Sequence, residues 1–528
     1  MKDSYRRIAA IIKTDFWIRF RRISTIIIFL GLSIGAYLWI PDVSSGKALL
    51  QVDERRAVYN SAALGLATAS LCTILLGLVA YYMVSSSIRR DVVTRTGFII
   101  ASTPVRNFEY LTGKFLGNVV YLSALVTGFM LSAMVMQLVR GEAPLQPHVF
   151  LYHYLILVPP MIVSVSVLAV VFECIPFLSG KFGDFAYFFV WMFALVLIAE
   201  GSKSAGKPNW ASYFDISGMG MIISQFKEIT HSDSLSIGSS SYDQTKSPIV
   251  FEGLHLTRGW LLPRLGATFF WIPLLSIAYL FFHRFNPAKL KASSQKAKHH
   301  LFARINGWLK PLTSWIFSFG SGNRRMKVSF VRSVFSEMRV VFQLSPIYVF
   351  GVIGFGIAAL LMPVANLQRG LLPALFAVLA IVLADISTRE SSAGTTGIIY
   401  AAPYLKPDYV IWKFAAATLV TFSFTAIPFV KLLLTSLGSA ISLIVGSILI
   451  AAAATSLGVM SSNPKTFIVA FLMFWYLALN DGGKSTAFDF AGWYGTATIR
   501  VRLLYSVAAF AMLAMAHVVY RYQHKRSY

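Results

Sequence analysis

The stretch "ALNDGGKS", residues 478 to 485, has the spacing of a relaxed P-loop, a Gly-rich loop that binds the phosphates of a nucleotide. In such a loop, backbone N–H groups hold the phosphates, a Lys reaches the outer phosphates, and a Ser or Thr holds magnesium. A P-loop follows a short buried strand, whereas Lys484 follows "TFIVAFLMFWYLALN", an apolar run suited to a membrane-spanning helix. We therefore expect Lys484 to lie in a polar turn after a helix and not to bind ATP.

Other patterns that carry catalysis or metal binding are missing from the sequence. It contains no H-E-x-x-H, no G-x-S-x-G and no Cys/His ligand cluster, and the pairs His148 with His153 and His299-His300 lack co-ligands. The two cysteines, Cys72 and Cys174, are in or beside apolar runs, where we expect them to pack. The sequence thus predicts no catalytic residue, no metal site and no cofactor in this chain.

Ionisable residues within apolar runs usually mark ion pathways or proton relays, and here they are few. Asp385 precedes Arg389 by four residues, a spacing that favours a local ion pair. The others are near the ends of apolar runs or can extend toward the interface, and all are expected to be structural: Glu173, Glu200, His517 and Lys431. Transport driven by protons or sodium therefore has little support.

The composition is that of an integral membrane protein, with 56% hydrophobic residues, 13% charged residues and a mean hydropathy of +0.65. Apolar runs of about 20 residues, the length that crosses a bilayer, predict an all-α membrane protein with about twelve transmembrane helices, or about ten if some are re-entrant. The predicted centres are near residues 32, 75, 127, 163, 190, 273, 355, 379, 425, 449, 472 and 510.

The distribution of Lys and Arg predicts the orientation of these spans. Residues 1–22 carry seven basic and two acidic side chains, and residues 284–332 carry eleven basic and none acidic, whereas loops 41–61 and 201–263 are balanced. This places both termini in the cytoplasm and Lys484 on the outer side, away from ATP. The excess of Lys and Arg that gives the net charge of +25 is then expected to contact anionic lipid of the inner leaflet rather than nucleic acid.

The chain also contains an internal repeat. At an offset of 299, "RDVVTRTGFIIASTPVRNFEYLTGKF" (90–115) aligns with "RESSAGTTGIIYAAPYLKPDYVIWKF" (389–414), with eight of 26 positions identical. Acids are kept at Asp91/Glu390 and at Glu109/Asp408. Such self-similarity between halves is typical of duplicated transporters.

Each half opens with an amphipathic segment, "IAAIIKTDFWIRF" (8–20) and "FVRSVFSEMRVVF" (330–342), and a third such stripe spans 299–317. We interpret them as helices in the inner interface of the membrane. Packing against a soluble partner subunit is the alternative.

The repeated segments resemble the loop after the second span of type-2 ATP-binding-cassette (ABC) transporter permeases, which reads acid-x3-Gly-Thr, an aliphatic pair, a Pro, and a Lys opening the next span. The second copy fits closely, and the first departs in having Arg95 where Gly is usual. "WASYFDISGMG" (210–220) also resembles the family's pattern, though weakly.

The resemblance implies a fused pair of transmembrane halves, 1–283 and 328–528, joined by a basic cytoplasmic linker, 284–327, with a large outer loop, 201–263. It implies that segments 89–114 and 389–413 form short helices that couple to a separate ATP-binding subunit. Two copies of this subunit would bind each chain, and the subunit would hold ATP and magnesium. The coupling residues so implied are Arg90, Asp91, Thr96, Pro104, Glu109 and Lys114 in the first copy, and Arg389, Glu390, Gly394, Thr395, Pro403, Asp408 and Lys413 in the second.

The expected function is a permease subunit, without an ATPase site of its own, of an exporter in a bacterial inner membrane. Apolar and small polar side chains would suit a hydrophobic or amphipathic substrate, although no substrate can be identified. Two alternatives stay open: a major-facilitator-type secondary carrier, and a membrane scaffold without transport. The retained acids are expected either to pair with a basic groove on the ATPase or to cap a helix start.

Overall fold

The structure, a computed structural model, describes residues 2–21, 23–203, 207–230, 235–254, 256–282, 285, 330–397 and 408–525. The chain divides into two compact units, Met1–Lys291 and Ala292–Tyr528. The division falls within the predicted linker 284–327, most of which, like the amphipathic stripe at 299–317, lies outside the described residues.

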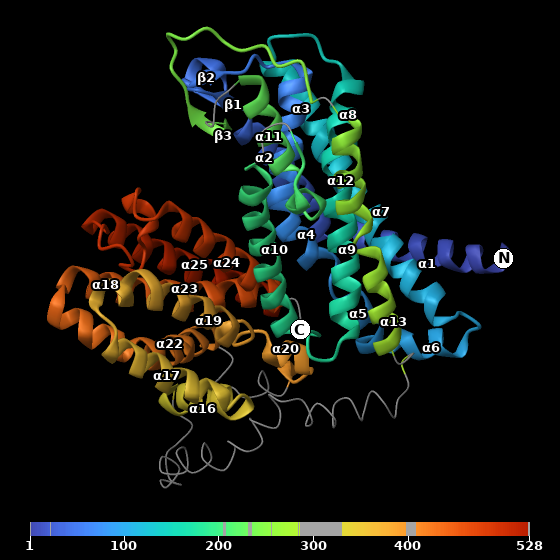
Figure 1. The fold of residues 1–528 in the computed structure, drawn as a ribbon. Coiled ribbons are helices and arrows are strands. Elements are labelled where there is room, and N and C mark those ends of the chain that lie inside the picture. The colour runs from blue at the N-terminus through green and yellow to red at the C-terminus, as the bar shows by residue number, and fades with distance from the viewer. Residues whose placement is uncertain are drawn as a thin grey trace. The chain divides into compact units, whose positions relative to one another are not determined.

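The first unit is mainly a bundle of long apolar helices (Figure 1). Its helices are α1 (Lys2–Phe20), α2 (Ile23–Trp39), α3 (Ser61–Leu71), α4 (Gly77–Val84), α5 (Ser87–Val93), α6 (Thr96–Ser102), α7 (Asn107–Arg140), α8 (Pro147–Leu157), α9 (Pro159–Cys174), α10 (Lys181–Gly201), α11 (Met219–Thr230), α12 (Arg258–Phe269) and α13 (Leu275–Phe281). Short helical turns are η1 (Val43–Ser45), η2 (Cys72–Leu76), η3 (Trp210–Tyr213) and η4 (Ile272–Leu274). The bend of 43° between α8 and α9 falls at Pro159, whose ring removes a backbone donor and disfavours a continuous helix.

A small sheet joins two loops that are far apart in sequence. Strands β1 (Lys47–Val52), β2 (Arg55–Arg56) and β3 (Leu235–Ser241) pair antiparallel in the order β2-β1-β3, with Leu50 opposite Ile237. The sheet lies at one end of the first unit, and α5 and α6 lie at the other end (Figure 1). The balanced loops 41–61 and 201–263 thus meet at the end opposite the basic segment 89–114.

The second unit repeats this order of elements without a sheet in its described residues. Its helices are α16 (Phe330–Leu344), α17 (Ile347–Leu361), α18 (Val364–Asn366), α19 (Leu372–Leu383), α20 (Arg389–Ala393), α22 (Tyr409–Thr435), α23 (Leu437–Ser461), α24 (Pro464–Asp481) and α25 (Ile499–Lys525), with the turns η6 (Leu367–Leu371) and η7 (Thr486–Phe488).

All twelve predicted span centres fall within helical segments, but fewer helices are long and apolar enough to cross a membrane. Among the described residues there are eight such helices, or up to ten if each of two bent pairs is one span. The remaining centres, near 32 and 472, fall in α2 and α24, which are not among these ten. The structure is therefore mainly helical and consistent with an all-α membrane protein with eight to ten candidate spans among the described residues, and the twelve-span count stays a prediction.

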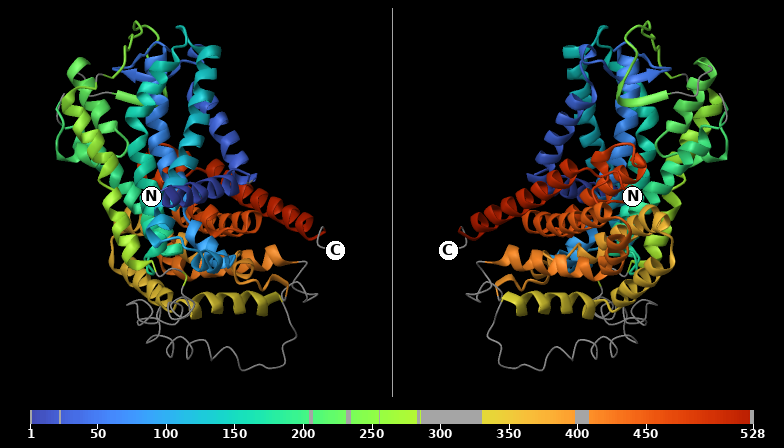
Figure 2. Two further views of the ribbon diagram at one scale, coloured as in Figure 1. Left: turned by 90° about the vertical axis from the view of Figure 1, so that its right-hand side faces the viewer. Right: turned by 90° about the vertical axis from the view of Figure 1, so that its left-hand side faces the viewer.

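The predicted amphipathic segments form α1 and α16, and both lie across neighbouring helices. Figures 1 and 2 show α1 crossing the long helices of the first unit, and α16 meets α17 at an angle of 95°. Both helices expose large apolar side chains, including Trp17 and Phe20 on α1 and Phe335 on α16. This is the geometry expected of helices that lie in a membrane interface.

A cysteine at Ser102, exposed on α6, and one at Ser241, exposed at the end of β3, should label from opposite sides of the membrane. The two native cysteines are buried, so they should contribute little background. A membrane-impermeant maleimide applied to intact and to permeabilised cells distinguishes the sides. Labelling of both positions in intact cells would contradict the predicted orientation.

Candidate functional site

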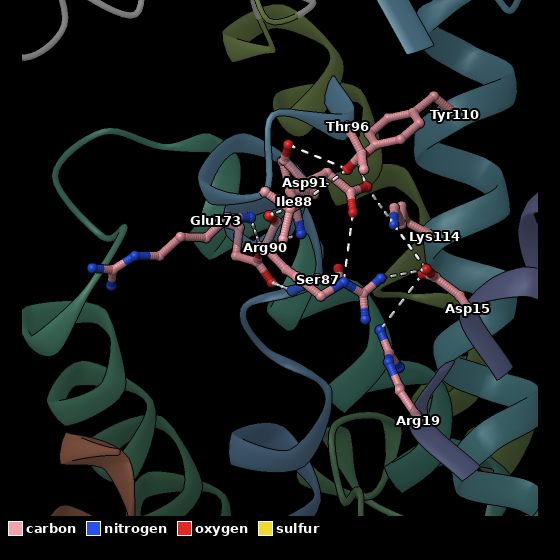
Figure 3. A network of polar contacts seen from close by, with 12 residues as sticks. Asp15, Arg19, Ser87, Ile88, Arg90, Asp91, Thr96, Tyr110, Lys114 and Glu173 are labelled. Atoms are coloured by element: carbon pink, nitrogen blue, oxygen red, sulfur yellow. Dashed lines mark hydrogen bonds and ion pairs between the residues drawn. The ribbon is translucent and has the colours of Figure 1, made fainter. Parts of the chain in front are cut away.

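The first copy of the repeat is organised around a buried lysine. Lys114, in the first turns of α7, is 2% exposed, and its Nζ lies 2.9 Å from Asp15 Oδ1 and 2.7 Å from Asp91 Oδ2. Tyr110, one turn earlier, donates its hydroxyl to Asp91 Oδ2 at 2.7 Å. One cation thereby joins α1, α5 and α7 (Figure 3).

Two arginines complete this cluster. Arg90 lies with Nη2 2.7 Å from Asp15 Oδ1 and Nε 3.6 Å from Asp91 Oδ1, and Arg19 Nη2 lies 3.7 Å from Asp15 Oδ2. Burial acts to raise the pKa of Asp15, but the cations of Lys114, Arg19 and Arg90 together lower the pKa below its ordinary value. Asp15 is therefore a carboxylate surrounded by three cations.

Glu173 at the end of α9 fixes the position of α5. Its carboxylate accepts the backbone N–H groups of Ser87 at 2.8 Å, Ile88 at 2.6 Å and Arg89 at 2.9 Å (Figure 3). These are groups at the start of a helix, which have no partner within the helix itself. A carboxylate supplied from another helix satisfies them, in accord with the structural role expected of Glu173.

The second unit contains a matching cluster of a lysine, a tyrosine, an arginine and two acids. Lys413, wholly buried near the start of α22, pairs with Glu390 on α20 and has its Nζ 3.0 Å from Glu337 Oε1 on α16. Tyr409 donates its hydroxyl to Glu390 Oε2 at 3.0 Å. Arg389 Nη1 lies 2.9 Å from Glu337 Oε1. The predicted pair with Asp385 also forms, with Arg389 Nη2 3.1 Å from Asp385 Oδ1.

Asp15 and Glu337 are the acids of the clusters that sequence reasoning missed. Each is the eighth residue and the only acid of its amphipathic segment, 8–20 or 330–342. Aligning these two segments with each other, as was done for 90–115 and 389–414, would have revealed the shared acid. Only the fold shows that this acid meets the lysine that recurs in the repeated segment, Lys114 or Lys413.

Three of the four acids of the repeat, Asp91, Glu109 and Glu390, are buried, and this changes the expectation that these acids pair with a partner. Asp91 is 6% exposed and Glu390 is 7% exposed, and both pair with a lysine of their own unit. They are not available to fill a basic groove on a partner. Glu109 instead accepts the backbone N–H of Arg106 at 2.9 Å, which is the helix-start role left open above. Asp408 is exposed and makes no side-chain cap at the start of α22.

The remaining predicted residues hold the repeated segment in shape. Thr96 donates its hydroxyl to the carbonyl oxygen of Asp91, and Thr395 donates to that of Glu390, each at 3.4 Å. Pro104 is exposed, and its carbonyl oxygen accepts from Arg7 Nη1 at 2.7 Å. Pro403 lies within 398–407, outside the described residues.

Arg95 occupies a position that favours glycine. Its φ is +60°, and Gly394, the residue 299 positions later, has φ +69°. A left-handed conformation costs a non-glycine residue roughly 1–2 kcal/mol. We therefore expect Arg95→Gly to raise the free energy of unfolding by about 1 kcal/mol, less the entropy that glycine adds to the unfolded chain.

Thermal unfolding in detergent would detect this as a small increase in Tm. The matched control is Gly394→Arg, which should lower Tm. A decrease for Arg95→Gly would show that the Arg95 side chain contributes more than its backbone conformation costs.

The first repeated segment presents an apolar surface outward. Between α5 and α7, the short helix α6 exposes Phe98 (41%) and Ile99 (67%), and Val93 at the end of α5 is 72% exposed. We call these three residues the α6 surface. Thr96 at the start of α6 bonds to the backbone of Asp91, a member of the buried cluster, so that this exposed surface adjoins the cluster.

Lys484 is exposed in a turn that follows the helix α24, and its backbone N–H bonds to the carbonyl oxygen of Asp481 at 3.1 Å. The helix in place of a strand confirms that this stretch lacks the context of a P-loop. Within the described residues there is also no group of three or more His, Cys, Asp or Glu side chains that could hold a metal ion. His148 and His153 belong to α8, and His153 Nδ1 lies 2.8 Å from the carbonyl oxygen of Val149.

Comparisons with protein-family models, with curated proteins and with solved structures find no match to this chain. Its function has to be inferred from its own repeat and from the geometry of the two clusters.

Proposed function

We propose that this chain is the membrane-spanning permease of an ABC exporter, and that each half couples to a separate ATP-binding subunit through its repeated segment. The ATP and magnesium would be bound by that partner, in two copies per chain. The substrate would cross a bacterial inner membrane, and its class, hydrophobic or amphipathic, follows only from the apolar character of the spans.

The observation that carries this proposal is the retention of one ionic cluster in both units. Lys114 and Lys413 each join an acid on an interfacial helix to an acid in the repeated segment. A signal for membrane orientation needs only exposed Lys and Arg in the loop. It does not need a buried lysine with two carboxylates, and still less the same arrangement twice.

The cluster is mechanically suited to coupling. A buried ion pair with hydrogen-bonded partners is held in one geometry, because separating its charges in the interior is costly. Thr96 at the start of α6 bonds to the backbone of Asp91 on α5, and Lys114 joins Asp91 to α7 and α1. A displacement of α6 by a partner would therefore be passed through α5 to α1 and to α7, a helix long enough to span the membrane. The secondary-carrier and scaffold alternatives give no reason for a rigid connection of this kind behind an exposed apolar surface.

The experiment is purification of the tagged full-length chain from its native membrane under mild detergent. We expect an ATP-hydrolysing subunit to co-purify at two copies per chain and to lose activity when its own nucleotide site is mutated. A chain that purifies without any ATPase and still catalyses transport driven by an ion gradient would support the secondary-carrier alternative instead.

A further inference from the structure

The two units share more than the ionic clusters. The second shared feature is a turn, which in each unit lies on the predicted outer side of the membrane. "YFDISG" (213–218) and "AFDFAG" (487–492) each begin within a short helical turn, η3 or η7, and each ends in a glycine with positive φ, 78° at Gly218 and 74° at Gly492. Asp215 accepts the N–H of Gly218 at 2.9 Å, and Asp489 accepts the N–H of Thr496 at 2.7 Å. The Asp organises the turn in both units.

A third shared feature connects two helices in each unit. Trp191 of α10 donates its indole N–H to the carbonyl oxygen of Ile74 at 2.9 Å, and Trp475 of α24 donates to that of Pro373 at 2.8 Å. Ile74 and Pro373 are 299 residues apart, the offset of the repeat. The turn, the tryptophan helix and the second apolar helix can therefore be compared position by position between the units.

At the place where these three elements meet, the first unit has a cavity and the second has an aromatic cluster. Gly77, Val190 and Ile216 line the cavity. Their counterparts, at offsets of 299, 284 and 274, are Phe376, Phe474 and Phe490.

These rings fill the equivalent space in the second unit. The Phe376 and Phe490 centroids are 5.5 Å apart, and those of Phe474 and Phe490 are 4.9 Å apart. Trp493 packs against both Phe376 and Phe490. Three phenylalanines therefore occupy this space in the second unit. In the first unit a glycine and two aliphatic residues leave it empty.

The polar groups of the cavity wall are directed into the protein. Thr73 donates to the carbonyl oxygen of Ser70, Ser164 to that of Met161, and Tyr187 to that of Gly77. A buried water needs two to four polar partners, and an apolar cavity stays dry. This cavity is therefore suited to an apolar occupant.

The shape of the cavity limits that occupant to something thin. The volume is about 30 Å³, which has room for the end of a chain rather than for a whole molecule. Val190 and Ala194 of α10, which line it, are partly exposed. A chain could therefore enter past α10 while the rest of the molecule stays outside the unit.

We propose that this cavity of the first unit binds the end of an alkyl chain, and that the second unit has lost the equivalent site to its aromatic cluster. The chain belongs either to a membrane lipid or to an amphipathic molecule that the protein encounters in the membrane. The proposal does not depend on coupling to ATP, because it rests only on the contrast between the two units.

Photo-crosslinking tests it on the full-length chain in nanodiscs. One arm uses phosphatidylcholine with a diazirine at the end of an acyl chain, and the other adds an alkyl maltoside with a diazirine at the end of its chain. After illumination, mass spectrometry maps the labelled residues. We expect adducts on cavity residues such as Met161, Val165 and Leu168, and the arm that yields them identifies the source of the chain.

One set of variants fills the cavity of the first unit with larger side chains, and another variant removes a ring from the aromatic cluster of the second unit. Ile216→Phe and Gly77→Leu should reduce these adducts to background, and Phe376→Ala should create adducts at the equivalent positions of the second unit. Gly77→Ala is the mild variant, because an added Cβ would meet its nearest neighbour, Met161 Cγ, at 3.4 Å. It should fold normally and lower the yield of adducts.

Monodisperse gel filtration establishes that each variant is folded before it is illuminated. Absence of cavity adducts from the unmodified chain in both arms would overturn the proposal. So would adducts whose yield is unchanged in folded Gly77→Ala and Ile216→Phe.

Discussion

Methionine in place of Lys413 is expected to leave the second unit too unstable to purify as a monodisperse protein. Lys413 is wholly buried, and its ammonium group neutralises Glu337 and Glu390. Removing one partner of a buried ion pair costs about 3–5 kcal/mol, because the charge that remains is uncompensated. A loss of that size is a large part of the 5–15 kcal/mol that typically stabilises a folded domain.

The measurement is the fraction of full-length protein that elutes as a single gel-filtration peak, followed by its Tm. The control is Lys484→Met, which removes an exposed lysine and should change neither. Combining Lys413→Met with Glu337→Gln and Glu390→Gln should restore most of the folded fraction. If Lys413→Met alone were as stable as the unmodified chain, the buried cluster would not be holding α16, α20 and α22 together.

The second large effect is expected on the α6 surface, where Phe98→Asp with Ile99→Asp should abolish association with an ATP-binding subunit. Both side chains are exposed, so the substitution should not disturb the fold. An aspartate in the centre of an apolar interface typically costs roughly 2 kcal/mol or more, which is about a thirtyfold loss of affinity for each residue.

The matched control replaces the same residues by other apolar side chains, Phe98→Leu with Ile99→Leu. This variant should retain the partner and transport. Loss of the partner in both variants would point to a structural fault in α6, and retention in both would show that this surface does not dock anything.

Sequence reasoning could predict the helices because the apolar runs are long and the few polar residues between them have a clear sign bias. The same reasoning left the number of spans at twelve or ten, for a physical reason. A hydropathy window measures apolar length and does not detect the right-angle turn between α16 and α17 or the short length of α2.

The repeated segments were also found from sequence, because their spacing is constant. Arg90, Tyr110 and Lys114 align with their counterparts at a single offset, and the structure places all six in clusters. The acids Asp15 and Glu337 lie at an offset of 322, because the chain between the interfacial helix and the repeat differs in length. One offset cannot align both features, and only the fold brings them together.

Segment 210–220 was singled out from sequence, but its match to the turn of the second half was missed for the same reason. Phe214-Asp215 and Phe488-Asp489 are separated by 274 residues rather than 299, because the chain between the repeated segment and the turn is longer in the first half. Only three of the eight residues "FDISGMGM" recur in "FDFAGWYG". The similarity of the two turns is evident from the structure, where Asp215 and Asp489 each accept backbone N–H groups of their own turn.

The central claim is that the α6 surface touches an ATP-binding subunit, and site-specific photo-crosslinking in the native membrane tests it most directly. A benzoyl-phenylalanine at Ile99 should form an adduct with an ATP-hydrolysing protein, whereas the same residue at Leu434, which is 83% exposed at the far end of α22, should not. An ATPase adduct at 99 alone is the result we predict. No ATPase adduct at 99, in membranes where the chain is folded and active, would contradict the account.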